Sequence, residues 1–555
     1  MSARDVVAVG EPLALDAGVA PARSGHEAAA TIGVAGWTLV SRVTGFARVA
    51  IIGATLGPTF FANIFQATNV VPNITYNLMA GSLLTTLIVP SLVEALDREN
   101  LDRARQVTQG LLGVAIAGFC AAGVVVLALG PLLVHLLTLG IHDASLASRA
   151  RQESWVLLLL VVPQIVLYGI AAVGVAAQNA RRHFALAAAA PAVENLGLIV
   201  TLLLAARWFG TGIGIRGVTP GYLFVLGLGA TLSVAAHAAL QLFGAARVGL
   251  LSWPAWGWHD PAVRDVCRRS VATIGTAMVD AGWAFALIVA AGTVPGGVVA
   301  LQIGLSFYFL PVALSAKAVG TVLLPQLARQ AGRGNLGRFR RVYDRGLSRI
   351  WFIAVPASAA LVVLAHPISE AFAFGEFRHG RAVELVAVSV ASLGVALIAG
   401  ATSDFARQAC YARRDQMTPL IGGLALLAIT ALHGFAILLA LGLVTAVGEL
   451  ARSLIVDHAA RKGTPDHGSW RRHTLLRNLG VAVVTIGPAA LVARVVSGAV
   501  AGHIGALAGL ALGSGIGLCA YVGAQAALDA PELPAVLRRR ARHAPTTTGG
   551  GSRAT

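Results

Sequence analysis

Two arginines lie within an apolar stretch near the N-terminus and could bind an anionic ligand. Arg42 and Arg48 occur in the segment Ser41-Arg42-Val-Thr-Gly45-Phe-Ala-Arg48. Their six-residue spacing corresponds to about 120° around an ideal helix, so they share a narrow face only if Gly45 bends the helix. Because a planar guanidinium suits phosphate oxygens, we interpret both as diphosphate-binding residues. The alternative is a structural ion pair with an acid on another helix.

A lysine in a later apolar stretch is a third cationic candidate. Lys317 follows Ser306 by eleven residues, which places both side chains on nearly the same face of one helix. An ionised group within the membrane costs about 2.5–3.5 kcal/mol on insertion scales, so it normally faces a cavity or a partner. We therefore predict that Lys317 faces a substrate cleft. The alternative is a side chain that extends to the membrane interface.

Acidic residues within apolar stretches could balance these cations. Glu194 and Asp280 are predicted either to pair with the two N-terminal arginines or to carry coupling protons. Glu449 and Arg452 are three residues apart on one expected helix, so they are predicted to neutralise each other. Asp404 lies near the end of an expected helix and is predicted to be structural.

No sequence motif supports catalysis. The chain has no glycine-rich phosphate-binding loop, no acidic sugar-nucleotide site outside the apolar stretches, and no zinc-type spacing of His and Cys. Its four cysteines are widely separated and form no Cys-x-x-Cys pair. We therefore expect a protein that is not an enzyme and uses no cofactor or metal ion.

The composition predicts the elements that position these residues. The chain of 555 residues is 56% hydrophobic and 12% charged, whereas soluble domains are about 25% charged. Runs of about 20 apolar residues, enough to cross a bilayer, recur along it. We predict an all-α polytopic membrane protein with about 14 transmembrane helices. The expected spans are 29–56, 61–93, 107–134, 154–177, 184–206, 220–245, 268–292, 298–328, 348–366, 383–406, 418–438, 441–460, 474–496 and 501–526.

The net charge of +17 would favour a nucleic-acid partner in a soluble protein, but the placement of the charges gives another explanation. Most of the 42 lysines and arginines fall in the tails and in the loops on one side of the expected spans. This asymmetry predicts that both termini are cytoplasmic. It also removes the reason to expect nucleic acid.

Two pairs of local motifs indicate an internal duplication. Their offsets are nearly equal, 235 residues for the first pair and 232 for the second. The pairs are Thr86-Leu-Ile-Val-Pro90-Ser-Leu92 with Thr321-Val-Leu-Leu-Pro325-Gln-Leu327, and Gln178-Asn-Ala-Arg181-Arg182-His183 with Cys410-Tyr-Ala-Arg413-Arg414-Asp415. We predict two six-helix pseudo-repeats plus two C-terminal helices, with a substrate cleft between the repeats. The expected units are a disordered cytoplasmic tail (1–28), an N-lobe (29–246), a C-lobe (263–460), the last two helices (474–527) and a basic disordered cytoplasmic tail (528–555).

Several of these motifs also resemble those of a known family. Ser41-Arg42-Val-Thr-Gly45-Phe-Ala-Arg48, Val71-Pro72-Asn73, Val89-Pro90, Gly320-Thr321-Val-Leu-Leu-Pro325, Phe374-Gly375-Glu-Phe377 and Tyr411-Ala-Arg413-Arg414-Asp415-Gln-Met-Thr418-Pro419 occur in that family's order. Over roughly residues 31–460 the chain resembles the MurJ/MviN lipid II flippases of the MOP exporter superfamily, as a divergent member.

The resemblance implies a V-shaped transporter in the bacterial cytoplasmic membrane. Such a protein moves polyprenyl-diphosphate-linked peptidoglycan precursor from the inner to the outer leaflet. The implied partners are this lipid-linked saccharide, membrane lipids and cell-wall synthesis proteins. A cationic central cavity would hold the diphosphate, and the last two helices would form a groove for the lipid tail.

The chain departs from the family pattern at several cavity positions. Asn77 stands where the family has an arginine in the second helix, and Ser306 stands where it has one in the eighth. Lys317 is predicted to restore one of these charges, so Arg42, Arg48, Lys317, Asn77 and Ser306 are the expected substrate-binding residues. The eleventh span lacks the acid of the sodium site found in some relatives, so sodium coupling is not predicted.

These departures leave other functions open. The chain could export another polyprenyl-diphosphate-linked glycan, or act as a transport-inactive scaffold for cell-wall enzymes. A MATE-like antiporter of small molecules is a further alternative.

Overall fold

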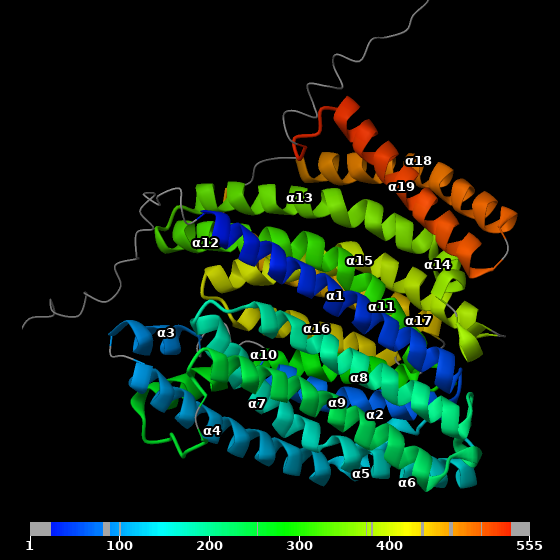
Figure 1. Cartoon of the computed structure of the whole chain (residues 1–555). Helices are drawn as coiled ribbons and strands as arrows, with labels where there is room; N and C mark the ends of the chain where they lie inside the picture. The colour runs from blue at the N-terminus through cyan, green and yellow to red at the C-terminus, as the bar shows by residue number, and fades with distance from the viewer. Residues whose placement is uncertain are drawn as a thin grey trace, which may run out of the picture.

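Long helices lie side by side in the computed structural model of the chain (Figure 1). The structure describes residues 24–80, 89–98, 101–251, 253–372, 374–378, 381–433, 438–465, 470–500 and 502–533. The helices of the first half are α1 (Ser24–Leu56), α2 (Phe60–Ala80), α3 (Val89–Arg98), α4 (Leu101–Ala128), α5 (Gly130–Leu137), α6 (Ala144–Val161), α7 (Pro163–Ala180), α8 (Ala185–Phe209) and α9 (Pro220–Arg247). Those that follow are α10 (Pro261–Ala291), α11 (Gly297–Val312), α12 (Ala318–Gly332), α13 (Leu336–Val363), α14 (Ala365–Phe372), α15 (Ala382–Ala412), α16 (Met417–His433), α17 (Leu438–Arg461), α18 (Trp470–Ala499) and α19 (His503–Ala527).

The prediction of an all-α polytopic membrane protein is confirmed. Within the described residues, ten helical segments are long and apolar enough to cross a membrane, and shorter apolar stretches lie in α10 and α16. Each expected span coincides with one helix or with consecutive helices, although residues 81–88 of the second span, 434–437 of the eleventh and 501 of the last lie outside the described part. The total of fourteen spans stays a prediction. Most of the two expected tails, residues 1–23 and 534–555, also lies outside the described part.

Local sequence explains where several helices begin. Asp143 precedes α6 and accepts a hydrogen bond from the backbone N–H of Leu146, which satisfies one donor of the first turn. Hydrogen bonds from the Ser145 hydroxyl and from Leu146 lower the pKa of Asp143. The first residue of α9 is Pro220, which follows the capping residue Thr219. Proline loses no hydrogen bond at this first position, because the backbone N–H groups there have no partner within the helix.

The two halves share one pattern of helix contacts. In the first half, α8 packs against α1 and α9, α7 packs against α9 and α4, and α2 contacts α7. In the second half, α16 packs against α10 and α17, α15 packs against α17 and α13, and α11 contacts α15. The halves also meet reciprocally, since α1 contacts α11 and α2 contacts α10. This pattern supports the proposed division into two six-span repeats.

The second motif pair forms the same turn in both halves. Arg182 and Arg414 are two of the three non-glycine residues with positive φ in the described chain, at 57° and 63°. After each of them, a backbone N–H reaches back to close the preceding helix: His183 donates to the Gln178 carbonyl and Asp415 to the Cys410 carbonyl. The two turns therefore match in backbone conformation as well as in sequence, which further supports a duplication.

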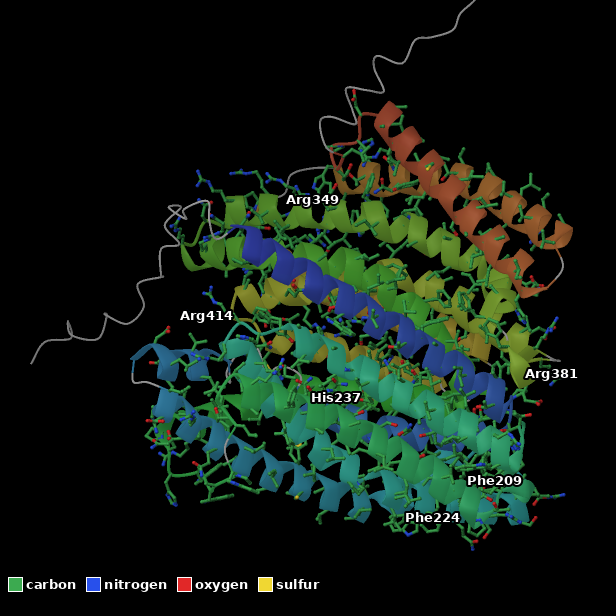
Figure 2. The ribbon with its side chains drawn as sticks, viewed as in Figure 1. Phe209, Phe224, His237, Arg349, Arg381 and Arg414 are labelled. Atoms are coloured by element: carbon green, nitrogen blue, oxygen red, sulfur yellow. The ribbon has the colours of Figure 1, made fainter. Side chains whose placement is uncertain are left out.

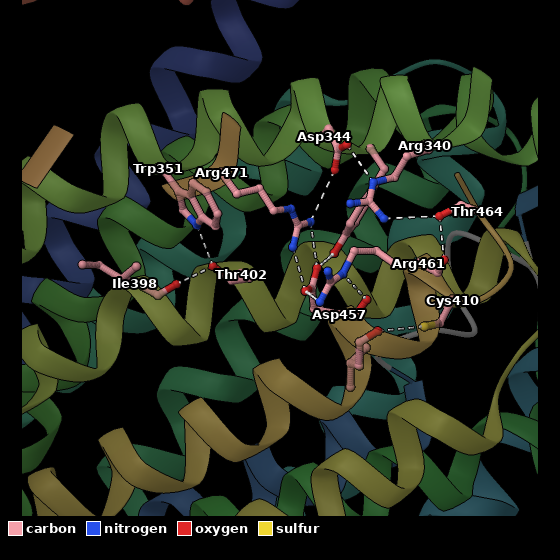
Figure 3. A network of polar contacts seen from close by, with 12 residues as sticks. Arg340, Asp344, Trp351, Ile398, Thr402, Cys410, Asp457, Arg461, Thr464 and Arg471 are labelled. Atoms are coloured by element: carbon pink, nitrogen blue, oxygen red, sulfur yellow. Dashed lines mark hydrogen bonds and ion pairs between the residues drawn. The ribbon is translucent and has the colours of Figure 1, made fainter. Parts of the chain in front are cut away.

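The last two long helices lie at one edge of the array, beside α13 (Figure 1). An ionic network fixes α18 there: the Arg471 guanidinium donates to both carboxylate oxygens of Asp457 at 2.8 and 3.0 Å (Figure 3). Asp344 and Arg340 of α13 extend this network. A second pair joins Arg477 of α18 to Glu532, which follows α19. The helix pair therefore docks on the C-terminal repeat through buried charges.

Close packing between α15 and α17 gives a first testable prediction. A Cβ atom added at Gly442 of α17 would lie 1.9 Å from the Ser392 hydroxyl oxygen of α15. We expect Gly442→Ala to lower the free energy of unfolding by about 1–3 kcal/mol, because two packed helices must separate. The control is Gly480→Ala on α18, where an added Cβ meets nothing within 4 Å. Thermal unfolding in nanodiscs measures both variants, and equal losses of stability would contradict the packing.

Candidate functional site

Two adjoining hollows lie between the six-span sets. We call the first the N-lobe hollow: it has a volume of about 260 Å³, and Arg48, Asn73, Gln164 and Glu194 are among its lining residues. The second, the C-lobe hollow, measures about 420 Å³ and is lined by charged residues of α10, α15 and α17. The hollows share five lining residues, which are Ile74, Asn77, Trp283, Ala284 and Phe309. They therefore form two parts of one polar region at the interface between the halves.

A buried carboxylate, that of Glu194, lines the N-lobe hollow. The Tyr168 hydroxyl donates to Glu194 Oε1 at 2.8 Å, and His237 Nδ1 lies 2.7 Å from Oε2. Arg48 Nη1 is 3.7 Å from Oε1, which is an ion-pair distance but a long one. The side chain of Glu194 is only 12% exposed. Of the two partners predicted for Glu194 on the first helix, the structure brings Arg48 to it.

The packing of α1 on α8 sets this geometry. Asn195 Nδ2 donates to the Ser41 carbonyl and to the Thr44 hydroxyl, both at 3.2 Å. A Cβ added at Gly45 would lie 3.3 Å from the same nitrogen, so glycine permits the close approach of the two helices. Helix α1 runs without interruption through Gly45, and the two arginines of this helix have different surroundings. Accordingly Arg42 is exposed and lines neither hollow.

The C-lobe hollow contains paired charges on three helices. Arg407 of α15 contacts Asp280 at 2.9 Å and Asp404 at 2.6 Å. Arg452 of α17 contacts Asp280 at 3.2 Å and Glu449 at 3.8 Å, and the Ser403 hydroxyl donates to Glu449. The predicted mutual neutralisation of Glu449 and Arg452 is confirmed. Asp280 pairs with these two arginines rather than with the arginines of α1.

Sequence reasoning missed three members of the site. The expected tenth span, 383–406, ends just before Arg407, but α15 continues to Ala412. His237 is an ionisable residue inside the sixth expected span, so its position alone was a detectable signal. It lies near the middle of the helix array, between the ends marked by Arg414 and Arg381 (Figure 2). Tyr168 gave no such signal, because tyrosine is common in membrane helices.

The remaining predicted site residues do not all lie in the hollows. Lys317 is exposed into the C-lobe hollow and has no ion-pair partner among the described residues. It ends a π-helical segment, Ala313–Lys317, which breaks the 100° periodicity behind the prediction that it shares a face with Ser306. Ser306 lines neither hollow, and its hydroxyl donates to the Gln302 carbonyl. Asn77 lines both hollows and donates to Asn73.

The charges that line the hollows balance. The cations are Arg48, Lys317, Arg407 and Arg452, and the acids are Glu194, Asp280, Asp404 and Glu449. The cationic cavity implied by the resemblance is thus replaced, in the described residues, by one without formal excess charge. Within the same residues no group of three or more His, Cys, Asp or Glu side chains is placed to hold a metal ion.

An array of membrane-crossing helices in two matching halves, with charged hollows between them, defines an α-helical membrane transporter. Residues 52–456 match the family described as lipid II flippase MurJ, which is most of the chain. The chain therefore belongs to the MurJ lipid II flippase family, which is a family of transporters rather than of enzymes.

Individual relatives agree with this assignment. The chain is 24% identical over 472 residues to the lipid II flippase MurJ of Burkholderia cenocepacia, covering 82% of this chain and 88% of that protein. It is 27% identical over 397 residues to the probable lipid II flippase MurJ of Rhizobium tropici, covering 70% and 71% of the two chains.

Solved structures confirm the fold. The structure of a lipid II flippase MurJ in an inward closed conformation is similar at a TM-score of 0.68, with 15% identity, covering 90% of this chain and all of that one. An inward-facing multidrug resistance MATE family transporter of the MOP superfamily is similar at a TM-score of 0.59, with 11% identity, covering 78% and 97% of the two chains.

Proposed function

We propose that this protein moves lipid II from the cytoplasmic to the outer leaflet of the bacterial inner membrane by alternating access. The family assignment supports this transport class. The observation that best supports a binding site for the diphosphate is Arg48, which lines the hollow between the two halves. Transporters built from two repeats bind their substrate at the repeat interface. The hollows lie at that interface.

Each predicted site residue has a proposed role. Arg48, Lys317 and Asn77 line the hollows and would bind the diphosphate and sugar. Arg42 and Ser306 lie outside both hollows, so they would meet substrate only in another conformation of the transport cycle. The groove role of α18 and α19 for the lipid tail is a proposal from the family resemblance, as are contacts with cell-wall synthesis proteins.

The orientation is part of the same proposal. Exposed arginines gather near one end of α13, where Arg341, Arg345 and Arg349 lie on successive turns. Such clusters are typical of cytoplasmic ends of membrane helices. Both termini would then be cytoplasmic, and the membrane lipids would surround the helix array.

Complementation tests the cargo. We expect the chain to restore growth in a strain depleted of its own lipid II flippase. An exporter of another lipid-linked glycan would leave that strain without growth, although the protein is present in the membrane. A transport-inactive scaffold would likewise leave that strain without growth. Full growth with a double variant in which Arg42 and Arg48 are both replaced by alanine would contradict transport that depends on these arginines.

The lysine in the C-lobe hollow gives a second prediction. Lys317→Gln should weaken binding of a diphosphate-linked lipid about fivefold, equivalent to about 1 kcal/mol, because an exposed cation interacts through water. Lys462→Gln is the matched control, since Lys462 is the other lysine of the chain and lines neither hollow. Binding to nanodisc-embedded protein measures both variants. An unchanged affinity for Lys317→Gln would remove Lys317 from the site.

A further inference from the structure

An anionic substrate would disturb the charge balance of the hollows. Four cations face four acids there, so no formal positive charge is in excess. A diphosphate esterified at both ends carries negative charge that does not titrate near neutral pH. Uncompensated charge is expensive beside buried side chains such as Glu194, and a group there normally changes its protonation state instead. Substrate entry should therefore be accompanied by protonation of one acid.

Glu194 is the acid whose cation is most easily diverted. Asp280 and Asp404 share Arg407 at 2.9 and 2.6 Å, which are hydrogen-bond distances. Glu449 lies 3.8 Å from Arg452 and accepts from the Ser403 hydroxyl, and Arg452 is itself fixed by a hydrogen bond to Asp280 at 3.2 Å. In contrast, the 3.7 Å contact with Glu194 is the one ion pair that Arg48 makes among the described residues. Arg48 can therefore turn to an anion in the hollow with little loss of direct bonding.

Glu194 also has a neighbour that can share a proton. His237 of α9 lies 2.7 Å from one carboxylate oxygen, and Tyr168 of α7 donates to the other. Tyr76 of α2 is the further titratable group that faces the carboxylate, and Arg48 of α1 is the cation. At this distance the carboxylate and the imidazole can share one proton. Once Arg48 leaves, one added proton makes this pair neutral overall.

We propose that binding of an anionic headgroup by Arg48 is accompanied by uptake of one proton at the Glu194–His237 pair. The inference rests on the proposed function, because it takes Arg48 as a ligand of the diphosphate. The proton comes from solvent and joins the pair, and no covalent bond of the substrate changes. Arg48 exchanges one anionic partner for another, and the proton replaces it at Glu194.

Proton uptake on binding fixes the direction in which affinity for the substrate changes with pH. The bound state holds one more proton than the free state, so the affinity for substrate must rise as the pH falls. For one proton the change is about tenfold per pH unit, within the range where the free protein is unprotonated and the complex is protonated. By the same reciprocity, substrate must favour protonation of the pair.

The test uses the whole protein in nanodiscs and a polyprenyl diphosphate that carries a disaccharide without a peptide. This probe has no group that titrates near neutral pH. Calorimetric titrations in two buffers with different enthalpies of protonation give the number of protons taken up on binding. We expect about one proton for the wild type and none for Glu194→Gln, which should still bind the probe with an affinity independent of pH. A second variant, His237→Gln, should move proton uptake to lower pH.

The outcomes separate the inference from the proposed function. Binding by the wild type without proton uptake would overturn the inference and leave the flippase assignment standing. Absence of binding by well-folded wild type would overturn the proposed function, and the inference with it. Proton uptake that persists in Glu194→Gln would place the proton at another acid and refute this site.

Discussion

Replacing Arg48 by alanine is expected to weaken binding of diphosphate-linked lipid by roughly 30- to 700-fold. Truncating one partner of a desolvated charge pair costs about 2–5 kcal/mol, and tenfold in affinity corresponds to about 1.4 kcal/mol. Arg48 is 29% exposed, so we take the lower part of that range, about 2–4 kcal/mol. Binding of lipid II to the nanodisc-embedded variant measures the loss.

Two variants of α1 serve as controls for this prediction. Arg42→Ala removes an arginine that lines neither hollow, and it should weaken binding much less. Arg48→Lys keeps the charge but loses the planar fork, so an intermediate affinity is expected. Equal losses for Arg42→Ala and Arg48→Ala would indicate a general effect of positive charge on α1 rather than a ligand at Arg48.

The second large effect concerns stability in the C-lobe hollow. Arg452→Ala is expected to lower the free energy of unfolding by about 3–5 kcal/mol, because Glu449 would be left as a buried acid without its cation. The two side chains are only 8% and 5% exposed, so water cannot replace the lost partner. Unfolding of the variant in nanodiscs, followed by helix content, gives the change.

A surface pair provides the comparison for Arg452. Arg216 lies 3.8 Å from Asp143 with 77% of its side chain exposed, so Arg216→Ala should change stability by about 1 kcal/mol or less. Combining Arg452→Ala with Glu449→Gln should recover part of the loss, since the second change removes the uncompensated charge. A double variant no more stable than Arg452→Ala alone would contradict this pairing.

Local sequence patterns predicted most of the fold. Hydrophobic runs of membrane-crossing length gave the helices, because the lack of water in the bilayer forces each backbone group to be satisfied within its own helix. The paired turns at Arg182 and Arg414 indicated a duplication from sequence alone, since each is a short motif formed by neighbouring residues. The π-helical segment before Lys317 could not be read in this way, because its hydrogen bonds leave no distinct residue pattern.

The ion-pair partners of the site residues were harder to predict than the site residues themselves. The positions of Glu194 and Asp280 within apolar stretches identified both as candidates, but which cation each contacts depends on the packing of distant helices. At the 235-residue offset of the motif pair nearest to α1, Trp283 of α10 takes the place of Arg48. A match between the halves therefore does not predict which charges line the site.

Translocation by the purified protein tests the central claim most directly. Liposomes containing the protein and lipid II in the inner leaflet should expose the lipid to an enzyme added outside, and protein-free liposomes should not. The Arg48→Ala protein should expose little lipid II at the same protein-to-lipid ratio. Exposure of lipid II at the protein-free rate by folded wild-type protein, or at the wild-type rate by Arg48→Ala, would contradict a flippase that uses Arg48 to hold its cargo.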